Sequence, residues 1–187
     1  MSQASFHLAL VLGGTRSGKS RYALDLAQKF PPPRLYLATA EAQDGEMAER
    51  IARHRRERGE GWDTLEAPLS VADALKRAQG RYQVILVDCL TLWLSNWLLQ
   101  NPGKEKMQEL CRGLEAQVRS LGTPAIFVSN EVGWGIVPEN PLAREFRDWS
   151  GWLHQLLAAA ADLVVLLVAG IPLTLKSPRK KDELYGT

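Results

Sequence analysis

Five short apolar runs recur along the chain, and segments with a helical spacing of apolar positions separate them. The runs are rich in Val, Leu and Ile, and they lie at Leu8–Leu12, Leu35–Ala38, Val84–Val87, Ala125–Val128 and Leu163–Val168. Continuous apolar strands are typical of a parallel sheet that is buried on both faces. The alternation therefore predicts an α/β fold in which helices cover both faces of a mostly parallel sheet.

The clearest helical pattern lies near the C-terminal end. Between Leu142 and Ala161, apolar residues recur at spacings of three and four, which places them on one face of a helix. Pro141 suits the first turn of this helix because an N–H there would have no helical partner. We expect the helix to pack on the core. We expect the segment 176–187, rich in Lys, Arg and Pro, to be loosely ordered.

Composition limits the class of protein. A chain of 187 residues suits a single domain spanning 1–187, and 45% hydrophobic and 24% charged residues are typical of a soluble globular protein. A formal net charge of +2 gives no global preference for nucleic acid. Cys89 and Cys111 lack metal-site spacing, which favours reduced thiols in a cytoplasmic protein. We expect neither a signal peptide nor a membrane span.

A P-loop match follows the first apolar run directly and reads Gly13-Gly14-Thr15-Arg16-Ser17-Gly18-Lys19-Ser20. Glycines in such a loop allow backbone N–H groups to approach a phosphate closely, where a Cβ would obstruct them. Lys19 would neutralise the β- and γ-phosphate oxygens, and Ser20 would bind Mg²⁺. The positive end of the helix that follows favours the same anion. The pattern predicts a nucleoside triphosphate site.

The third apolar run ends in an acid, Asp88. An acid in this position suits a Walker B element, which contacts Mg²⁺ directly or through water, although an acid at a strand end can also cap a loop. The P-loop earlier in the chain favours the metal-side interpretation.

A basic segment at Glu46–Arg58 carries five arginines around a single histidine, His54. Met47, Ile51 and His54 fall on one helical stripe, so the imidazole could face inward. Nearby guanidinium groups disfavour the imidazolium, which keeps a lone pair available to attack phosphorus, and they could stabilise phosphate charge. From this pattern alone, a solvated helix with Arg/Glu pairs in which His54 is incidental is favoured. A nucleic-acid site is less favoured because no aromatic residues are interleaved.

Three further features remain. The segment Thr91–Leu99 contains two tryptophans and could be core, a subunit interface or a wall for an apolar ligand, with core or interface favoured. The segment Val128–Asn140 follows an apolar run with polar and glycine residues, as substrate loops commonly do, but glycine turns alone could explain it. We assign His7 and His154 to structure because neither belongs to a chemical constellation.

Several of these strings together resemble one protein family. They are GGTRSGKS at 13–20, LYLATA at 35–40, EMAERIARHR at 46–55, WDTLE at 62–66, ILVDCLTLWLSN at 85–96 and SNEVGWGIVPENPLAREFRD at 129–148. The chain is similar, from about Leu10 to Lys176, to the bifunctional adenosylcobinamide kinase/adenosylcobinamide-phosphate guanylyltransferases of cobalamin assembly. The resemblance implies a RecA-like P-loop fold.

The resemblance also implies two reactions. The enzyme would phosphorylate the hydroxyl of adenosylcobinamide with ATP or GTP, and would then move GMP from GTP onto that phosphate, releasing pyrophosphate. In this family the second reaction passes through a guanylylated histidine, which the motif places at His54. The catalytic residues implied are His54 and Lys19.

Carried over by position, the resemblance implies nucleotide contacts at Gly13 to Ser20, at the three residues after the second strand and at the four residues after the histidine. These later contacts are Ala38, Thr39, Ala40, Arg55, Arg56, Glu57, Arg58, Glu66 and Asp88. Ser20 and Asp88 would be the Mg²⁺ ligands. Family members assemble as trimers, so a homotrimer is expected, with adenosylcobinamide and its phosphate as substrates and no nucleic-acid partner.

Two alternative functions remain open from the residues alone. One is a monofunctional P-loop kinase for another small alcohol, with His54 a bystander. The other is a nucleotide-switched RecA-like binding protein that acts through partners and forms no covalent nucleotide.

Overall fold

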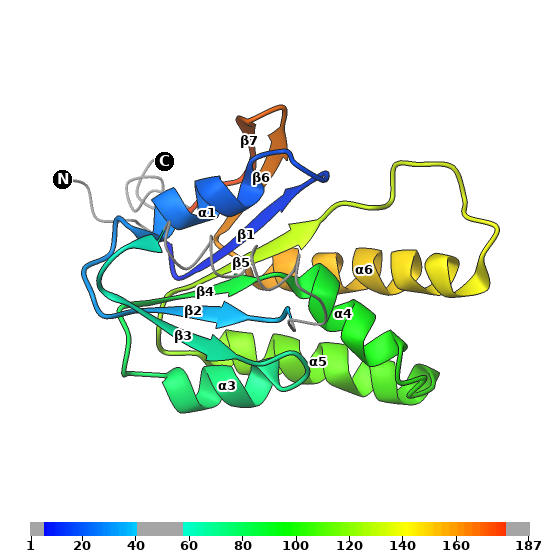
Figure 1. Cartoon of the computed structure of the whole chain (residues 1–187), viewed down its shortest axis with the longest axis horizontal. Coiled ribbons are helices and arrows are strands. Elements are labelled where there is room, and N and C mark those ends of the chain that lie inside the picture. Colours follow the sequence, from blue (N-terminus) through cyan, green and yellow to red (C-terminus); the bar gives the residue numbers. More distant parts are fainter. Residues whose placement is uncertain (1–5, 41–57, 179–187) are drawn as a thin grey trace, which may run out of the picture.

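The computed structural model describes residues 6–40 and 58–178, and its strands form one sheet. Along the sheet they follow the order β3-β2-β4-β5-β1-β6-β7 (Figure 1). Neighbouring strands are parallel except for the β6–β7 pair, which is antiparallel. The strands are β1 Leu8–Gly13, β2 Arg34–Ala38, β3 Trp62–Glu66, β4 Val84–Asp88, β5 Ala125–Asn130, β6 Leu163–Val168 and β7 Ile171–Lys176. The predicted mostly parallel α/β sheet is confirmed.

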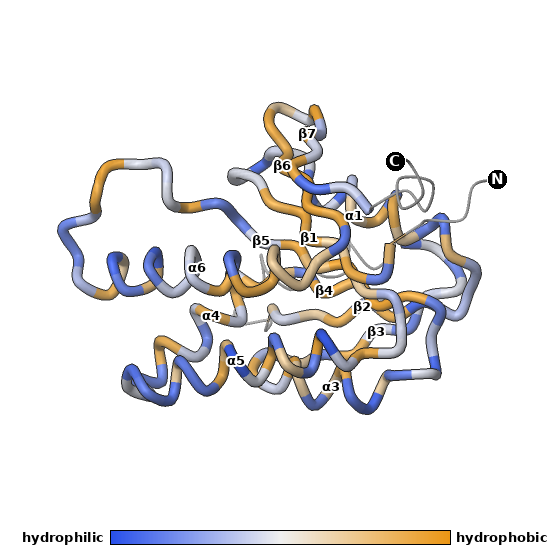
Figure 2. Tube along the Cα trace, turned by 180° about the vertical axis from the view of Figure 1, so that it is seen from behind, coloured by the Kyte–Doolittle hydropathy of each residue, from blue (hydrophilic) through white to orange (hydrophobic). Residues whose placement is uncertain are grey.

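Helices cover both faces of this sheet. They are α1 Lys19–Ala27, α3 Val71–Ala78, α4 Leu90–Leu98, α5 Lys104–Ser120 and α6 Pro141–Ala160. Alternate residues of β1 enter two cores: Ala9 and Val11 pack in the α1 layer, whereas Leu10 packs with α3, α4, α5 and α6. Figure 2 shows hydrophobic residues concentrated along the central strands between these layers. Burial on both faces explains the continuous apolar runs.

Helix α6 begins at Pro141, as predicted. Asn140 caps its first turn, because the Asn140 side chain accepts a hydrogen bond from the N–H of Ala143 at 3.2 Å. The stripe through Trp149, Leu153 and Leu157 is buried against the sheet. The predicted apolar helix face is confirmed.

The segment around α4 packs in the core, and Trp93 and Trp97 also line a cleft beside α3 and α5. Leu90, Leu94 and Leu98 are buried, and the indole N–H groups of Trp93 and Trp97 both donate to the carbonyl of Leu69, at 2.9 and 3.1 Å. Both tryptophans pack in the larger core. The favoured interpretation of this segment is therefore confirmed.

The apolar pattern did not indicate two strands, and both lie at sheet edges. No residue of β3 is fully buried, and every residue of β7 is exposed, so neither forms a continuous apolar run. Lys176 ends β7 and donates to the carbonyls of Ala158 and Ala159 at the end of α6. The rest of the predicted loose tail, from residue 179, lies outside the described residues.

Both cysteines are buried free thiols. Burial raises the pKa of Cys111 to about 12 and also raises the pKa of Cys89, so neither is a ready thiolate. In the part of the chain that the structure describes, no helix combines the length and apolarity needed to cross a membrane.

Candidate functional site

The P-loop joins β1 to α1 at the carboxyl edge of the sheet. Gly13 ends β1 in so little space that an added Cβ would collide with Ser17 Oγ and lie 2.7 Å from the carbonyl oxygen of Leu167. Gly18 is the N-cap of α1 and has a left-handed φ of 94°, which favours glycine. Close packing at Gly13 and the left-handed backbone at Gly18 thus explain the two glycines that define the pattern.

Hydrogen bonds from neighbouring strands hold this loop in place. The N–H of Glu131, which directly follows β5, donates to the carbonyl of Gly13 at 3.0 Å. The N–H of Gly170, in the β6–β7 turn, donates to the backbone carbonyl of Ser17 at 3.0 Å. Lys19 Nζ donates to the carbonyl of Gly14 at 3.0 Å and so lies over the loop. From there the ammonium group can neutralise phosphate oxygens that enter the loop.

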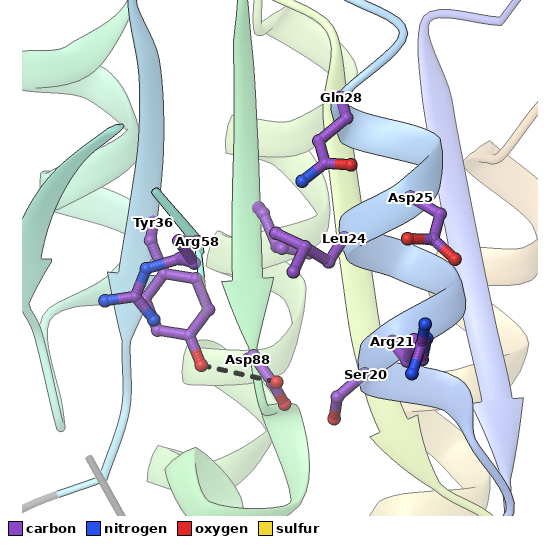
Figure 3. Close-up of a pocket in the computed structure, with 9 residues that line it drawn as sticks. Ser20, Arg21, Leu24, Asp25, Gln28, Tyr36, Arg58 and Asp88 are labelled. Atoms are coloured by element: carbon purple, nitrogen blue, oxygen red, sulfur yellow. Dashed lines mark hydrogen bonds between the residues drawn. The ribbon is translucent and has the colours of Figure 1, made fainter. Parts of the chain in front are cut away.

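A cleft of about 550 Å³ lies beside the P-loop, on the face of the sheet that α1 covers. Figure 3 shows side chains from α1, β2 and β4 converging on it, with Ser20 and Asp88 at the same end. Its lining consists of Ser20, Arg21, Leu24, Asp25, Gln28, Tyr36, Arg58, Leu86 and Asp88. The structure therefore brings together the P-loop serine, the strand-end acid and one arginine of the basic segment.

Tyr36 connects the charged groups of this cleft. Its hydroxyl donates to Asp88 Oδ2 at 3.3 Å, and the Arg58 guanidinium lies 3.7 Å from the centre of its ring (Figure 3). Burial, reinforced by the Asp88 carboxylate, raises the pKa of Tyr36 well above its ordinary value. The phenol therefore stays protonated and remains a donor that orients Asp88.

Arg58 is the described end of the basic segment. Its side chain is only 6% exposed, and Nη2 donates to Thr64 Oγ1 at 3.1 Å. A guanidinium held this rigidly can bind phosphate oxygens at a small entropic cost. His54, Arg55, Arg56 and Glu57 lie outside the described residues.

The predicted contacts at the ends of β2 and β3 do not line this cleft. Thr39 is fully buried; its Oγ1 donates to the carbonyl of Cys89 at 2.6 Å and accepts from the Cys89 N–H at 2.8 Å, which ties β2 to β4. Ala38 is buried at the end of β2 beside Asp88, and Ala40 is half-buried. Glu66 is exposed at the end of β3, at an edge of the sheet.

The donor set suits magnesium better than a metal held entirely by protein. Among the described residues, no group of three or more His, Cys, Asp or Glu is placed to hold a metal ion. Ser20 and Asp88 supply one hydroxyl and one carboxylate at the same end of the cleft. Mg²⁺ commonly binds through one or two such oxygens, together with substrate phosphates and waters.

Sequence reasoning missed four polar lining residues. On α1, Arg21, Asp25 and Gln28 are spaced i, i+4, i+7, so they lie on one stripe of the helix, and this spacing could have indicated them. Tyr36 sits in an apolar run that reads as an ordinary buried strand, so nothing in the sequence marked its contact with Asp88.

A second polar network lies behind the P-loop. His154 Nε2 lies 2.7 Å from Ser129 Oγ, which lies 3.3 Å from Thr91 Oγ1, and Thr91 Oγ1 accepts the N–H of Asn130 at 2.7 Å. His154 Nδ1 faces Glu131 Oε2 at 3.6 Å. Burial lowers the pKa of His154 and outweighs the opposing effect of the Glu131 carboxylate. A neutral histidine thus joins α6 to the ends of α4 and β5.

The two histidines assigned to structure make contacts of that kind. The His7 imidazole contacts the carbonyl of Leu121, while the backbone N–H of His7 donates to Asp162 Oδ2 at 2.8 Å. His154 is buried, and the Ser129 side chain that it contacts is fully buried. A Ser–His–Glu arrangement so enclosed offers no access to a substrate.

Comparison with known proteins identifies close relatives. Residues 9–175 match the family model CobU, described as cobinamide kinase/cobinamide phosphate guanyltransferase. The bifunctional adenosylcobalamin biosynthesis protein CobP of Pseudomonas aeruginosa is 46% identical over 89% of this chain and 96% of its own. The protein named CobU in Escherichia coli is 39% identical over 90% of this chain and 99% of its own.

Solved structures show the fold alone. An ATPase of a bacterial type III secretion system aligns with a TM-score of 0.55 and 10% identity, over 95% of this chain and 60% of that chain. A protein of Pyrococcus horikoshii aligns with a TM-score of 0.56 and 11% identity, over 94% of this chain and 88% of that one. The RecA-like P-loop fold is confirmed.

We predict that Gly13→Ala is destabilising even without nucleotide, because its Cβ meets Ser17 and the Leu167 carbonyl. The expected loss in unfolding free energy is about 1–3 kcal/mol, measured by urea denaturation of the apo protein. Gly14→Ala is the matched control, since nothing lies within 4 Å of a Cβ there, and it should change stability by less than about 0.5 kcal/mol. Equal stability of the two variants would contradict the packing argument.

We predict that His154 makes the protein less stable in mild acid. Its pKa is lowered in the folded protein relative to the ordinary value of 6.5, so the unfolded chain takes up the proton first. The unfolding free energy should therefore fall as pH drops below about 6.5 and level off once the folded pKa is passed. In His154→Gln, which keeps a polar side chain but cannot titrate, this fall should be smaller. Identical pH profiles for the two proteins would rule out the effect.

Proposed function

The chain belongs to the cobinamide kinase/cobinamide phosphate guanyltransferase family, and we propose that it carries out both reactions with nucleotides bound at the P-loop edge of the sheet. It is a kinase and guanylyltransferase of adenosylcobalamin biosynthesis, as its bifunctional relatives are. The first reaction phosphorylates adenosylcobinamide with ATP or GTP, and the second joins GMP to that phosphate. The two alternatives, a monofunctional kinase and a nucleotide-switched binding protein, are not favoured.

The observation that carries this proposal is the position of Arg58. This residue follows His54 by four positions in the sequence, and its side chain lines the same cleft as Ser20 and Asp88. The basic segment that the guanylyl transfer requires therefore ends inside the cleft that the P-loop borders.

In the kinase step, the chain mainly positions and stabilises charge. The amides of the P-loop and the Lys19 ammonium group hold the β- and γ-phosphates, while the acceptor hydroxyl attacks the γ-phosphorus. The bond between the γ-phosphorus and the bridging oxygen breaks, the nucleoside diphosphate leaves and the hydroxyl proton passes to solvent. Arg58 lies where it can offset charge on the phosphate oxygens.

Magnesium fits the Ser20–Asp88 end of the cleft. Its ligands would be the Ser20 hydroxyl, the Asp88 carboxylate and phosphate oxygens, and when bound it neutralises phosphate charge. Tyr36 holds the Asp88 carboxylate by its 3.3 Å hydrogen bond. This contact fixes the orientation of the acid before nucleotide enters.

The guanylyl transfer proceeds through His54. The neutral imidazole attacks the α-phosphorus of GTP, a P–N bond forms, the α–β P–O bond breaks and pyrophosphate leaves. A phosphate oxygen of adenosylcobinamide phosphate then attacks the same phosphorus and releases the histidine. The nucleotide contacts proposed around these steps are those that the family resemblance implied, including Arg55, Arg56 and Glu57 after the histidine.

The same resemblance supports two broader proposals. The protein acts in the cytoplasm, which accords with its two free buried thiols. It assembles as a homotrimer, which would give exposed apolar groups such as Leu173 and Leu175 on β7 a surface to cover them.

We predict that incubation with Mg²⁺ and α-labelled GTP places label on the denatured chain, and that His54→Ala carries none. The label should be acid-labile and alkali-stable, as a phosphoramidate is. His7→Ala is the matched control, since its imidazole contacts a backbone carbonyl away from the cleft, and it should label normally. Unlabelled wild type that still binds GTP would contradict the transferase mechanism and leave a plain kinase.

A further inference from the structure

The connection between β5 and α6, residues 131–140, exposes apolar side chains beside the phosphate edge. Trp134 is 78% exposed, Ile136 97% and Val137 61%. The other five tryptophans of the chain are buried or half-buried, so Trp134 differs from them in being exposed to solvent. Figure 1 shows this connection extending past the end of the sheet between β5 and α6. Exposure of one indole beside two aliphatic side chains usually marks a binding surface.

Charged side chains of α6 hold the backbone of this loop. Arg144 Nη1 donates to the carbonyls of Pro138 at 2.9 Å and Glu139 at 2.5 Å, and Arg147 Nη1 donates to the carbonyl of Gly135 at 3.4 Å. These bonds satisfy carbonyl groups that the loop cannot pair within itself. The apolar side chains are thus presented on a supported backbone.

The base of the loop is fixed to the phosphate site. Glu131 donates its N–H to Gly13, the first residue of the P-loop, and its Oε1 accepts the Gly133 N–H at 2.8 Å. Its other carboxylate oxygen faces His154, which is buried under α6. The first residue of the loop is therefore hydrogen-bonded to the P-loop, and its side chain orients the first turn.

We propose that residues 131–140 form the surface that binds the corrin ring of the acceptor, with Trp134 packing against a face of the macrocycle. This inference rests on the proposed function. A corrinoid is a large flat molecule with apolar faces and amide groups on its rim, and its reacting hydroxyl sits at the end of a flexible side arm. The arm must reach the P-loop while the ring stays outside it, and this loop offers an exposed apolar surface on a hydrogen-bonded backbone that begins at the P-loop.

Neighbouring groups suit the rest of such a ligand. The exposed side chain of Glu139 can accept hydrogen bonds from rim amides, and Ile136 and Val137 extend the apolar surface beyond the indole. A second copy of this chain is the competing occupant, and the experiment below separates the two.

The test is steady-state kinetics of full-length Trp134→Ala with adenosylcobinamide and ATP. We expect the KM for adenosylcobinamide to rise about tenfold or more, because a stacked aromatic contact is lost. The KM for ATP and self-labelling by α-labelled GTP should stay unchanged, since neither needs the corrin surface. Trp134→Phe should recover part of the loss. The matched control is Leu99→Ala, which removes a residue of similar exposure, 69%, at the end of α4.

Three outcomes would overturn the inference. An unchanged KM for adenosylcobinamide in Trp134→Ala would remove the loop from the acceptor site. A smaller sedimentation mass for this variant, with KM restored at high protein concentration, would assign the loop to contacts between copies. If wild type consumes no ATP in response to adenosylcobinamide, the proposed function fails, and this inference fails with it.

Discussion

The close packing of Gly13 is the constraint on which the site depends. At the end of β1 there is no room for a side chain between Ser17 and the carbonyl of Leu167, and the same residue accepts the N–H of Glu131. One backbone position thereby fixes the P-loop against β6 and against the chain leaving β5. A loop packed in this way is ordered before any nucleotide arrives, so nucleotide binding does not carry the entropic cost of ordering it.

The sheet then sets the relative positions of the candidate site residues. β5 lies between β1 and β4, so Asp88 faces the P-loop across one strand, and Tyr36 on β2 reaches Asp88 from the other side. Thr39 closes the ends of β2 and β4 with two hydrogen bonds. These hydrogen bonds pair the buried Thr39 hydroxyl and the Cys89 backbone at this edge, beside a large apolar core.

How far the sequence predicts this molecule depends on burial. The five inner or doubly covered strands carry continuous apolar runs and were found, whereas β3 and β7 lie at the edges and lack that signal. The P-loop and Asp88 were predicted because their residue types are tied to phosphate and metal chemistry. Tyr36 was missed because its role depends on a cross-strand neighbour, which no local pattern encodes. His54 lies outside the described residues, and its role remains a proposal.

The central claim is that one cleft, between Ser20 and Asp88, holds both the nucleotide and its metal. Fe²⁺ substituted for Mg²⁺ tests it directly, since ascorbate and peroxide then cut the backbone near the bound metal and mass spectrometry maps the cuts. The account predicts cuts beside Ser20 and Asp88 that appear only when GTP or ATP is present. Cuts that are the same with and without nucleotide would contradict the claim. So would cuts that cluster elsewhere, for instance around Trp97 on the opposite face of the sheet.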